Sequence, residues 1–420
     1  MFNLTASLSF TESEITVKAS NANLFNQILQ TVTAINNGET VATSSCSNED
    51  DRDAIDVYEE YCKGVGENLS LISIKNRTSV RNYARTLFNG KKLNEIDRKA
   101  MFEIKNNLDK LPVYLYNKDF YNRKMLLKDL PSYKKSFSTV TPGTQDRIFT
   151  MLVAFFNWCV AKGYKDTNPF DKQKLFNEKV QEEKVIAYTQ KDLEKLFVGD
   201  AFKRFHTRFS ARYWIPLFSL YTGARRSEIA ALDVDDIKTD KFGRWYISIN
   251  TNSKVPGKKK LVKNDHSARL IPIHNKLLEL GFKRYFEAIK AEGYPVLFPD
   301  VVIKSKGLVD GDAISVPFST YRQELKIEGH KTLHSLRHNA VACLKHKKCH
   351  LPDIQQLIGH AFGNITFDVY GEPSDMSEMF DLVNKIDYNL NIEPWVDSEL
   401  KKHTRERVWN KTKTNLRINS

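Results

Sequence analysis

The sequence of 420 residues predicts a mainly α-helical protein with one small antiparallel β-sheet. Apolar residues recur at helical spacing from 57 to 171, with Lys and Arg on the remaining positions. Two later runs, 244–250 and 269–274, have the alternation of β-strands and are separated by a lysine-rich stretch. Helical spacing returns over 275–388. A pair of strands framed by helices therefore defines the expected fold class.

Changes in composition divide the chain into five expected segments. Stretches rich in Ser, Thr and charged residues, with little apolar periodicity, indicate linkers. The expected segments are an acidic N-terminal appendage and linker over 1–54, a helical domain over 55–172, a linker over 173–186, a second domain over 187–388 and a basic tail over 389–420.

Signals for helix ends support these divisions. Thr144 is expected to cap the N-terminus of a helix that ends before Gly163. Thr189 and Asp192 have the spacing of a capping box and open the second domain. Further helices are expected over 209–221 and 227–232.

The charge pattern favours a polyanionic partner such as nucleic acid. Lys and Arg exceed Asp and Glu by 13, whereas residues 1–50 have one Lys and five acids. The appendage is therefore expected to contact protein or to be structural. After position 400 the tail has seven Lys or Arg and one acid, which predicts a solvated or disordered end or, alternatively, a helix that docks on phosphate or a partner.

Cysteine usage and apolar runs indicate a cytoplasmic protein. The five cysteines are odd in number and lack C-x-x-C spacing, so neither a disulfide framework nor a zinc ribbon is expected. The longest apolar run, 148–161, is shorter than a bilayer-spanning helix requires.

Residue types suited to phosphodiester chemistry recur in the second domain. Arg225 lies in Thr-Gly-Ala-Arg-Arg-Ser-Glu, where Glu228 has the spacing to support it. Arg is suited to phosphate because its planar group donates bidentate hydrogen bonds and remains charged. Lys263 lies in the turn between the two strand-like runs, with 258–260 as alternative lysines.

A His-x-x-Arg pair follows in His334-Ser-Leu-Arg337, with both side chains on one helix face. The same spacing occurs by chance at His266 and Arg269, so order and context decide between them.

The last motif runs from Leu-Ile-Gly-His360 to Tyr370, ten residues further on. A tyrosine at a helix end is more often a packing aromatic, and Tyr370 draws its weight from following the Arg, Lys and His-x-x-Arg motifs in order.

In that order, Thr-Gly-x-Arg-x-x-Glu, His-x-Leu-Arg-His, Leu-x-Gly-His and Tyr resemble the signature of the tyrosine recombinases of the phage-integrase type. The resemblance covers about 55–385. It implies that Tyr370 attacks the scissile phosphate and forms a 3′-phosphotyrosine, so that neither ATP nor a metal is required. It also implies roles for the remaining residues: Arg225 and Arg337 bind the nonbridging oxygens, Lys263 is the general acid, His334 assists proton transfer and His360 hydrogen-bonds the phosphate.

The resemblance further implies a helical core-binding domain and a catalytic domain that form a C-shaped clamp on double-stranded DNA. A homo-tetramer on two DNA sites is implied, as are docking of the C-terminal segment on a neighbouring protomer and an accessory DNA-bending or directionality protein. The chain departs from members with a basic N-terminal domain, since its first 50 residues are acidic.

Three alternatives remain at this point: an inactive DNA-binding protein of the same fold, a type IB-like topoisomerase, and a metalloenzyme. The last would use His346, Cys349 and His350, completed by Cys343 or Asp353, although neighbouring lysines oppose a cation there.

Overall fold

The structure, a computed structural model, describes residues 6–11, 14–19, 51–64, 69, 71–113, 138–175, 186–260, 268–360 and 375–418. The chain divides into two compact units, 1–182 and 183–420. The described residues are mainly helical with a small antiparallel sheet in the second unit, so the predicted fold class is confirmed.

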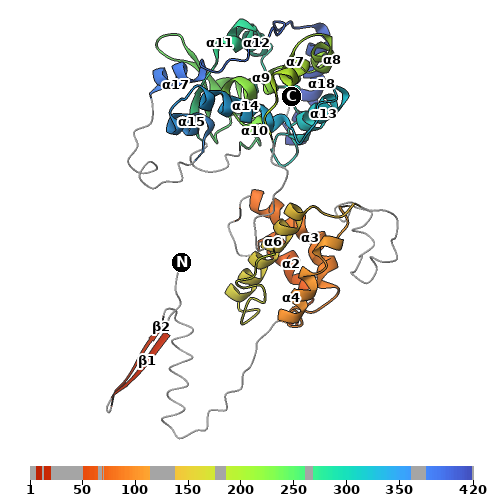
Figure 1. Cartoon of the computed structure of the whole chain (residues 1–420), viewed down its shortest axis with the longest axis vertical. Helices are drawn as coiled ribbons and strands as arrows, with labels where there is room; N and C mark the ends of the chain where they lie inside the picture. The colour runs from red at the N-terminus through yellow and green to blue at the C-terminus, as the bar shows by residue number, and fades with distance from the viewer. Residues whose placement is uncertain are drawn as a thin grey trace. The chain divides into compact units, whose positions relative to one another are not determined.

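The first unit contains a two-stranded hairpin and a helical core (Figure 1). Its elements are β1 (Ala6–Thr11), β2 (Glu14–Ala19), α2 (Ala54–Lys63), α3 (Leu71–Phe88), α4 (Arg98–Lys105), the 3-10 helix η1 (Leu108–Lys110) and α6 (Pro142–Ala161). Strands β1 and β2 pair antiparallel from Ala6 opposite Ala19 to Thr11 opposite Glu14.

The helical core of this unit is built on aromatic side chains. The ring centroids of Tyr58 and Phe155 lie 4.9 Å apart, and those of Phe155 and Phe156 lie 4.8 Å apart. Both phenylalanines are fully buried, as expected for a helix whose apolar residues recur at helical spacing.

The N-terminus of α6 differs from the expectation. The cap is Thr141, whose side chain accepts from the Thr144 backbone N–H, and Pro142 occupies the first turn. Proline fits there because it has no N–H to leave unpaired and its φ is already helical. Gly163, with φ of 74°, lies just past the helix end as predicted.

The second unit packs around one central helix, α9 (Ser210–Thr222). From its N-terminus the unit contains α7 (Gln190–Phe197), α8 (Asp200–His206), α9, α10 (Arg226–Ala230), the 3-10 helix η4 (Val234–Asp236), β3 (Ile237–Thr239), β4 (Trp245–Ile249), β5 (Arg269–Pro272), α11 (Asn275–Glu279), α12 (Phe282–Ala291), α13 (Asp312–Glu324), α14 (Leu333–His346), α15 (Leu351–Ile358), α17 (Met376–Val383) and α18 (Glu399–Leu416). The predicted capping box of Thr189 and Asp192 is present at α7.

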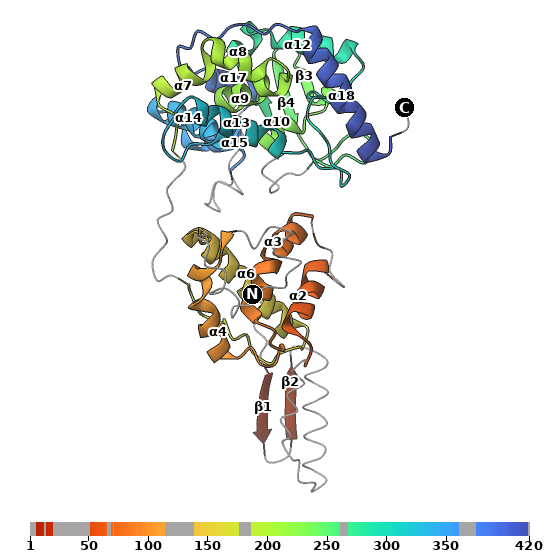
Figure 2. The same cartoon turned by 90° about the vertical axis from the view of Figure 1, so that its right-hand side faces the viewer.

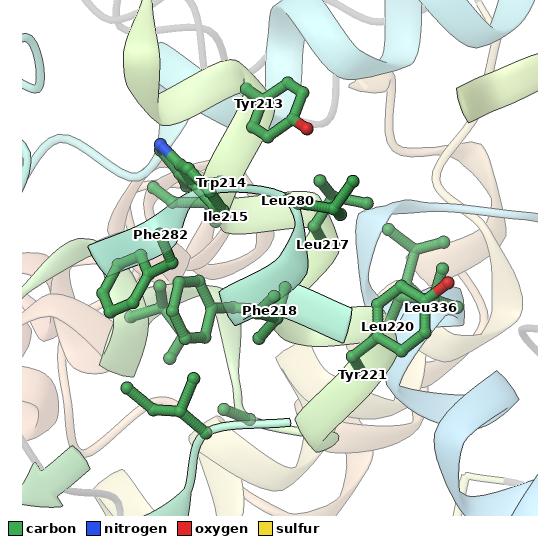
Figure 3. Close-up of a cluster of buried hydrophobic side chains, with 14 of the residues drawn as sticks. Tyr213, Trp214, Ile215, Leu217, Phe218, Leu220, Tyr221, Leu280, Phe282 and Leu336 are labelled. Carbon is green, nitrogen blue, oxygen red and sulfur yellow. The ribbon is translucent and has the colours of Figure 1, made fainter. Parts of the chain in front are cut away.

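Helix α9 is apolar on nearly every face and is buried accordingly. Figure 3 shows its side chains Trp214, Leu217 and Phe218 among those of neighbouring elements, including Phe282 of α12 and Leu336 of α14. Because α10 and α14 both contact α9, this core fixes the positions of the two helices that bear Arg225 and Arg337.

The sheet of this unit has three strands in the order β3-β4-β5, all antiparallel. Ile247 of β4 lies opposite Ile237 and Ile271, and both Ile247 and Ile271 are fully buried. Strands β4 and β5 correspond to the two predicted strand-like runs, whereas β3 was not predicted, because its three residues are too few to show alternation.

The C-terminal segment is an ordered helix and not the solvated or disordered end that was the default expectation. Helix α18 packs on its own unit (Figure 2). Its Arg405 is fully buried and donates to Glu292 at 2.7 Å and to Asp397 at 2.9 Å. A buried guanidinium requires such carboxylate partners; Glu292 caps the end of α12, and Asp397 directly precedes the N-cap of α18.

Candidate active site

Arg225 is positioned by the turn between α9 and α10. Gly223 ends α9 with φ of 68°, a conformation that favours glycine. The Arg225 backbone N–H donates to Glu228 Oε2 at 2.9 Å, and its Nη1 donates to Glu228 Oε1 at 2.6 Å. The support from Glu228 that the spacing predicted is therefore present.

Arg337 projects from α14 into the interior and is 3% exposed. Its Nη1 donates to the Gly223 carbonyl at 2.6 Å and its Nη2 to the Ile358 carbonyl at 2.6 Å. Burial, together with the nearby charges of Arg225 and Arg269, lowers the pKa of Arg337 to about 9. Arg337 stays protonated at neutral pH, so the lowered pKa reflects the cost of burying the charge and, second, its repulsion by Arg225 and Arg269, both of which a bound anion would offset.

Arg269 is a third arginine of the site, with a side chain that is 6% exposed, and it was not among the predicted site residues. It begins β5, and its Nη2 and Nη1 donate to the two oxygens of Glu228 at 2.9 and 3.2 Å. The residue had been noted as part of a chance His-x-x-Arg. An arginine directly ahead of the apolar run Leu-Ile-Pro-Ile is the signal that could have indicated a buried ion pair.

The three arginines meet at the C-terminal end of α15. The carbonyls of Leu357, Ile358 and Gly359 accept from Arg269 Nε at 2.8 Å, Arg337 Nη2 at 2.6 Å and Arg225 Nη2 at 2.9 Å respectively. These carbonyls lack partners within the helix, and the helix dipole places partial negative charge there. The helix end thus gathers three cations that would otherwise repel one another.

Gly359 is required at this junction for two reasons. Its φ is 66°, and a Cβ there would lie 2.7 Å from Arg269 Nη1. His360 follows immediately, is exposed, and donates its backbone N–H to the Gln355 carbonyl at 3.0 Å. The turn therefore presents His360 beside the arginines.

His334 lies in the first turn of α14, one helical turn before Arg337. The residue is exposed, yet desolvation of its ring and the charges of His338, Arg337 and Arg225 lower its pKa to about 4. His334 is therefore neutral at pH 7 in the DNA-free protein, and a phosphate nearby would raise this pKa. Figures 1 and 2 show α10, α14 and α15 together at one edge of the second unit.

Lys263 and Tyr370, the predicted general acid and nucleophile, lie outside the described residues. Two of the three alternative lysines form buried ion pairs with aspartates. Lys258 Nζ lies 2.5 Å from Asp233 Oδ1 and Lys260 Nζ lies 2.6 Å from Asp236 Oδ2, and all four side chains are buried. Burial lowers the pKa of Lys258, with Asp233 opposing the shift. These lysines hold the segment after β4 against η4.

The metalloenzyme alternative finds no support in the geometry. Over the described part of the chain, which includes His346, Cys349 and His350, no three metal-ligating side chains gather. His350 instead contacts Asp353 at 3.1 Å.

Within the same described ranges, no helix is long and apolar enough to span a membrane.

Comparison with known proteins identifies the class. Residues 198–376 match the model of the phage integrase family. This segment, which contains Arg225, His334, Arg337 and His360, belongs to that family, and the resemblance to the tyrosine recombinases is confirmed.

Similar solved structures are integrases of low sequence identity. The Tn1549 transposon integrase in complex with a circular intermediate DNA is 17% identical with a TM-score of 0.50, over 78% of this chain and 97% of that one. A lambda integrase dimer bound to a COC′ core site is 14% identical with a TM-score of 0.48, over 90% and 99%. The integrase from mycobacterium phage Brujita is 13% identical with a TM-score of 0.33, over 84% and 98%. No curated protein matches the chain.

Proposed function

We propose that this protein is a site-specific DNA recombinase that cleaves and rejoins DNA through a 3′-phosphotyrosine at Tyr370. The observation that carries the proposal is the convergence of Arg225 and Arg337 on the end of α15, beside His334 and His360, within a phage integrase segment. Such a cluster of cations with incomplete charge compensation is suited to a phosphate that gains negative charge in the transition state.

The reaction follows from the residue chemistry. The Tyr370 oxygen attacks phosphorus, the bond to the 5′ oxygen breaks, and Lys263 donates a proton to that leaving oxygen. Arg225 and Arg337 donate to the nonbridging oxygens. Each guanidinium has five N–H donors and uses part of them on carbonyls and Glu228, so donors remain for phosphate.

His334 and His360 complete the proposed site. His334 is neutral at pH 7 and can accept and return a proton, and His360 donates to a phosphate oxygen. The phosphotyrosine conserves the energy of the broken bond, so the proposed reaction uses neither ATP nor a metal. Attack by the free 5′-hydroxyl of another strand rejoins the DNA and releases Tyr370.

The proposed partner is double-stranded DNA, bound by a homo-tetramer on two sites in the cytoplasm. A mobile element is the proposed genetic context, with an accessory DNA-bending or directionality protein. The net charge of +13 agrees with a DNA partner.

Trapping of a covalent adduct tests the function. The substrate is a DNA duplex that contains the end or attachment sequence of the mobile element beside the gene, with a nick near the cleavage point. It is incubated with protein in EDTA, and covalent adducts are separated under denaturing conditions. Wild type should form an adduct and Tyr370→Phe should form none while still binding DNA. Tyr246→Phe, a half-buried tyrosine of β4, is the matched control and should retain the adduct.

The outcomes separate the proposal from its alternatives. Binding by wild type with no adduct would indicate an inactive DNA-binding protein, and an adduct that persists in Tyr370→Phe or requires metal would exclude the proposed nucleophile. Relaxation of supercoiled DNA without exchange between two sites would indicate a topoisomerase.

A further inference from the structure

A hollow adjoins the scissile-phosphate site that we have proposed and shares two of its residues. It has a volume of about 500 Å³ and lies among α10, α13 and the start of α14. Arg225 and His334 are among its lining residues. Besides Arg226, the remaining lining combines the apolar Phe318 and Leu333 with four hydroxyl side chains: Ser227, Ser315, Ser319 and Thr332.

Arg226 is the second cation of this hollow, and the chemistry assigned above does not use it. Its Nη2 lies 3.3 Å from the point where a Cβ on Gly311 would stand, so the side chain reaches across to the start of α13. In the described part of the chain no hydrogen bond or ion pair involves this guanidinium. Burial lowers the pKa of Arg226, as it does for a cation without full compensation, and the negative charge of Asp312 opposes this shift and so favours the charged form.

The hydroxyls around Arg226 differ in what they can donate. The Ser315 hydroxyl already donates to the Gly311 carbonyl at 2.8 Å. Ser227 and Ser319 are exposed in the lining. A phosphate oxygen accepts hydrogen bonds and carries negative charge, so one arginine and two hydroxyls form a matching set of donors.

We propose that Arg226, with Ser227 and Ser319, binds a second DNA phosphate next to the scissile one on the same strand. The inference rests on the proposed function, because Arg225 and His334, which also line the hollow, are the residues that we propose to act on the scissile phosphate. Consecutive positions in the chain, Arg225 and Arg226, thus serve consecutive phosphates: the first in the reaction and the second in holding the strand in register.

Neutralisation of single phosphates tests the assignment. Methylphosphonate replaces each phosphate around the cleavage point in turn, in the same junction duplex, and equilibrium binding is measured for wild type and Arg226→Met. Wild type should lose about tenfold in affinity at the phosphate next to the scissile one, and Arg226→Met should show no further loss there. The slope of log affinity against log salt should also fall by about 0.9 in the variant.

Two further variants make the comparison specific. Lys283→Met removes an exposed charge on α12 and should keep the wild-type pattern of interference. Arg226→Lys keeps the charge and should retain sensitivity at the same phosphate. Arg226→Gln is a second neutral variant that stands in if the Met substitution lowers the folded fraction, and it should match the pattern expected for Arg226→Met.

Equal sensitivity of wild type and both neutral variants at every phosphate overturns the inference. So does a lost sensitivity that maps to the scissile phosphate itself, because Arg226 would then act with Arg225. DNA binding with this interference pattern but without a covalent adduct supports the second phosphate site and refutes the proposed reaction, so the two failures are distinguishable.

Discussion

Removal of Arg269 should destabilise the second unit more than removal of any exposed cation. The substitution Arg269→Met deletes two hydrogen bonds to Glu228 and one to the Leu357 carbonyl, at 2.9, 3.2 and 2.8 Å. The side chains of Arg269 and Glu228 are 6% and 4% exposed, so solvent cannot replace those contacts.

The magnitude follows from what remains after the substitution. Breaking a buried ion pair by removing one partner costs about 3–5 kcal/mol. Glu228 keeps Arg225 at 2.6 Å, so we expect the lower end of that range, about 3 kcal/mol. For a unit of this size that corresponds to a fall of roughly 10 °C in Tm.

Thermal and urea unfolding of the full chain provide the measurement, with Lys283→Met as the exposed control. A double-mutant cycle with Glu228→Gln isolates the pair, because the Arg269→Met/Glu228→Gln protein leaves no buried carboxylate without a partner. The free energy of unfolding should fall less in the double variant than the sum of its decreases in the two single variants. A loss below about 1 kcal/mol for Arg269→Met, or strict additivity in the cycle, would refute the reasoning.

Three other predictions follow from described contacts. Lys258→Met should lower the free energy of unfolding by about 3 kcal/mol, because it removes the closest cation from the buried Asp233. Lys259→Met, at an exposed position, should lower it by under about 0.5 kcal/mol. Equal urea midpoints for the two variants would contradict the buried pair. Gly359→Ala should lower Tm more than Gly293→Ala. Both glycines have positive φ, but only at Gly359 would a Cβ meet Arg269. A larger decrease in Tm for Gly293→Ala would argue against that contact. Burial and nearby Lys401 lower the pKa of His206 to about 4, below its ordinary 6.5, so the unfolded chain binds more protons and stability should fall as pH drops from 6.5 towards 4. His206→Gln should flatten that fall in urea titrations, and an unchanged pH profile would exclude His206 as its source.

The sequence by itself determined the local elements and the family. Helical spacing of apolar residues and the capping box at Thr189 located α6 and α7, because both signals lie within one or two helical turns. The order of the motifs around Arg225, His334 and His360 indicated the phage integrase class, since phosphodiester chemistry needs these residue types and several such motifs rarely follow one another in the same order by chance.

Two local predictions failed, the first for a local reason and the second for a tertiary one. Thr144 was the predicted cap, but Pro142 favours the first helical position and the cap is Thr141. The charge of the segment after 400 predicted an unstructured end, yet Arg405 is buried against Asp397, which lies just ahead of α18, and against Glu292, which lies at the end of α12 far away in the sequence.

Only the tertiary structure decided which cations surround the site. Lys258 and Lys260 are indistinguishable from Lys259 by composition, and their pairing with Asp233 and Asp236 depends on how η4 packs beneath the segment after β4. Arg269 joins the cluster because backbone carbonyls at the end of α15 accept from it and from the two predicted arginines. Every residue has such a carbonyl, so no side-chain pattern reveals which three will face a buried charge; folding determines that by bringing one helix end to three guanidiniums.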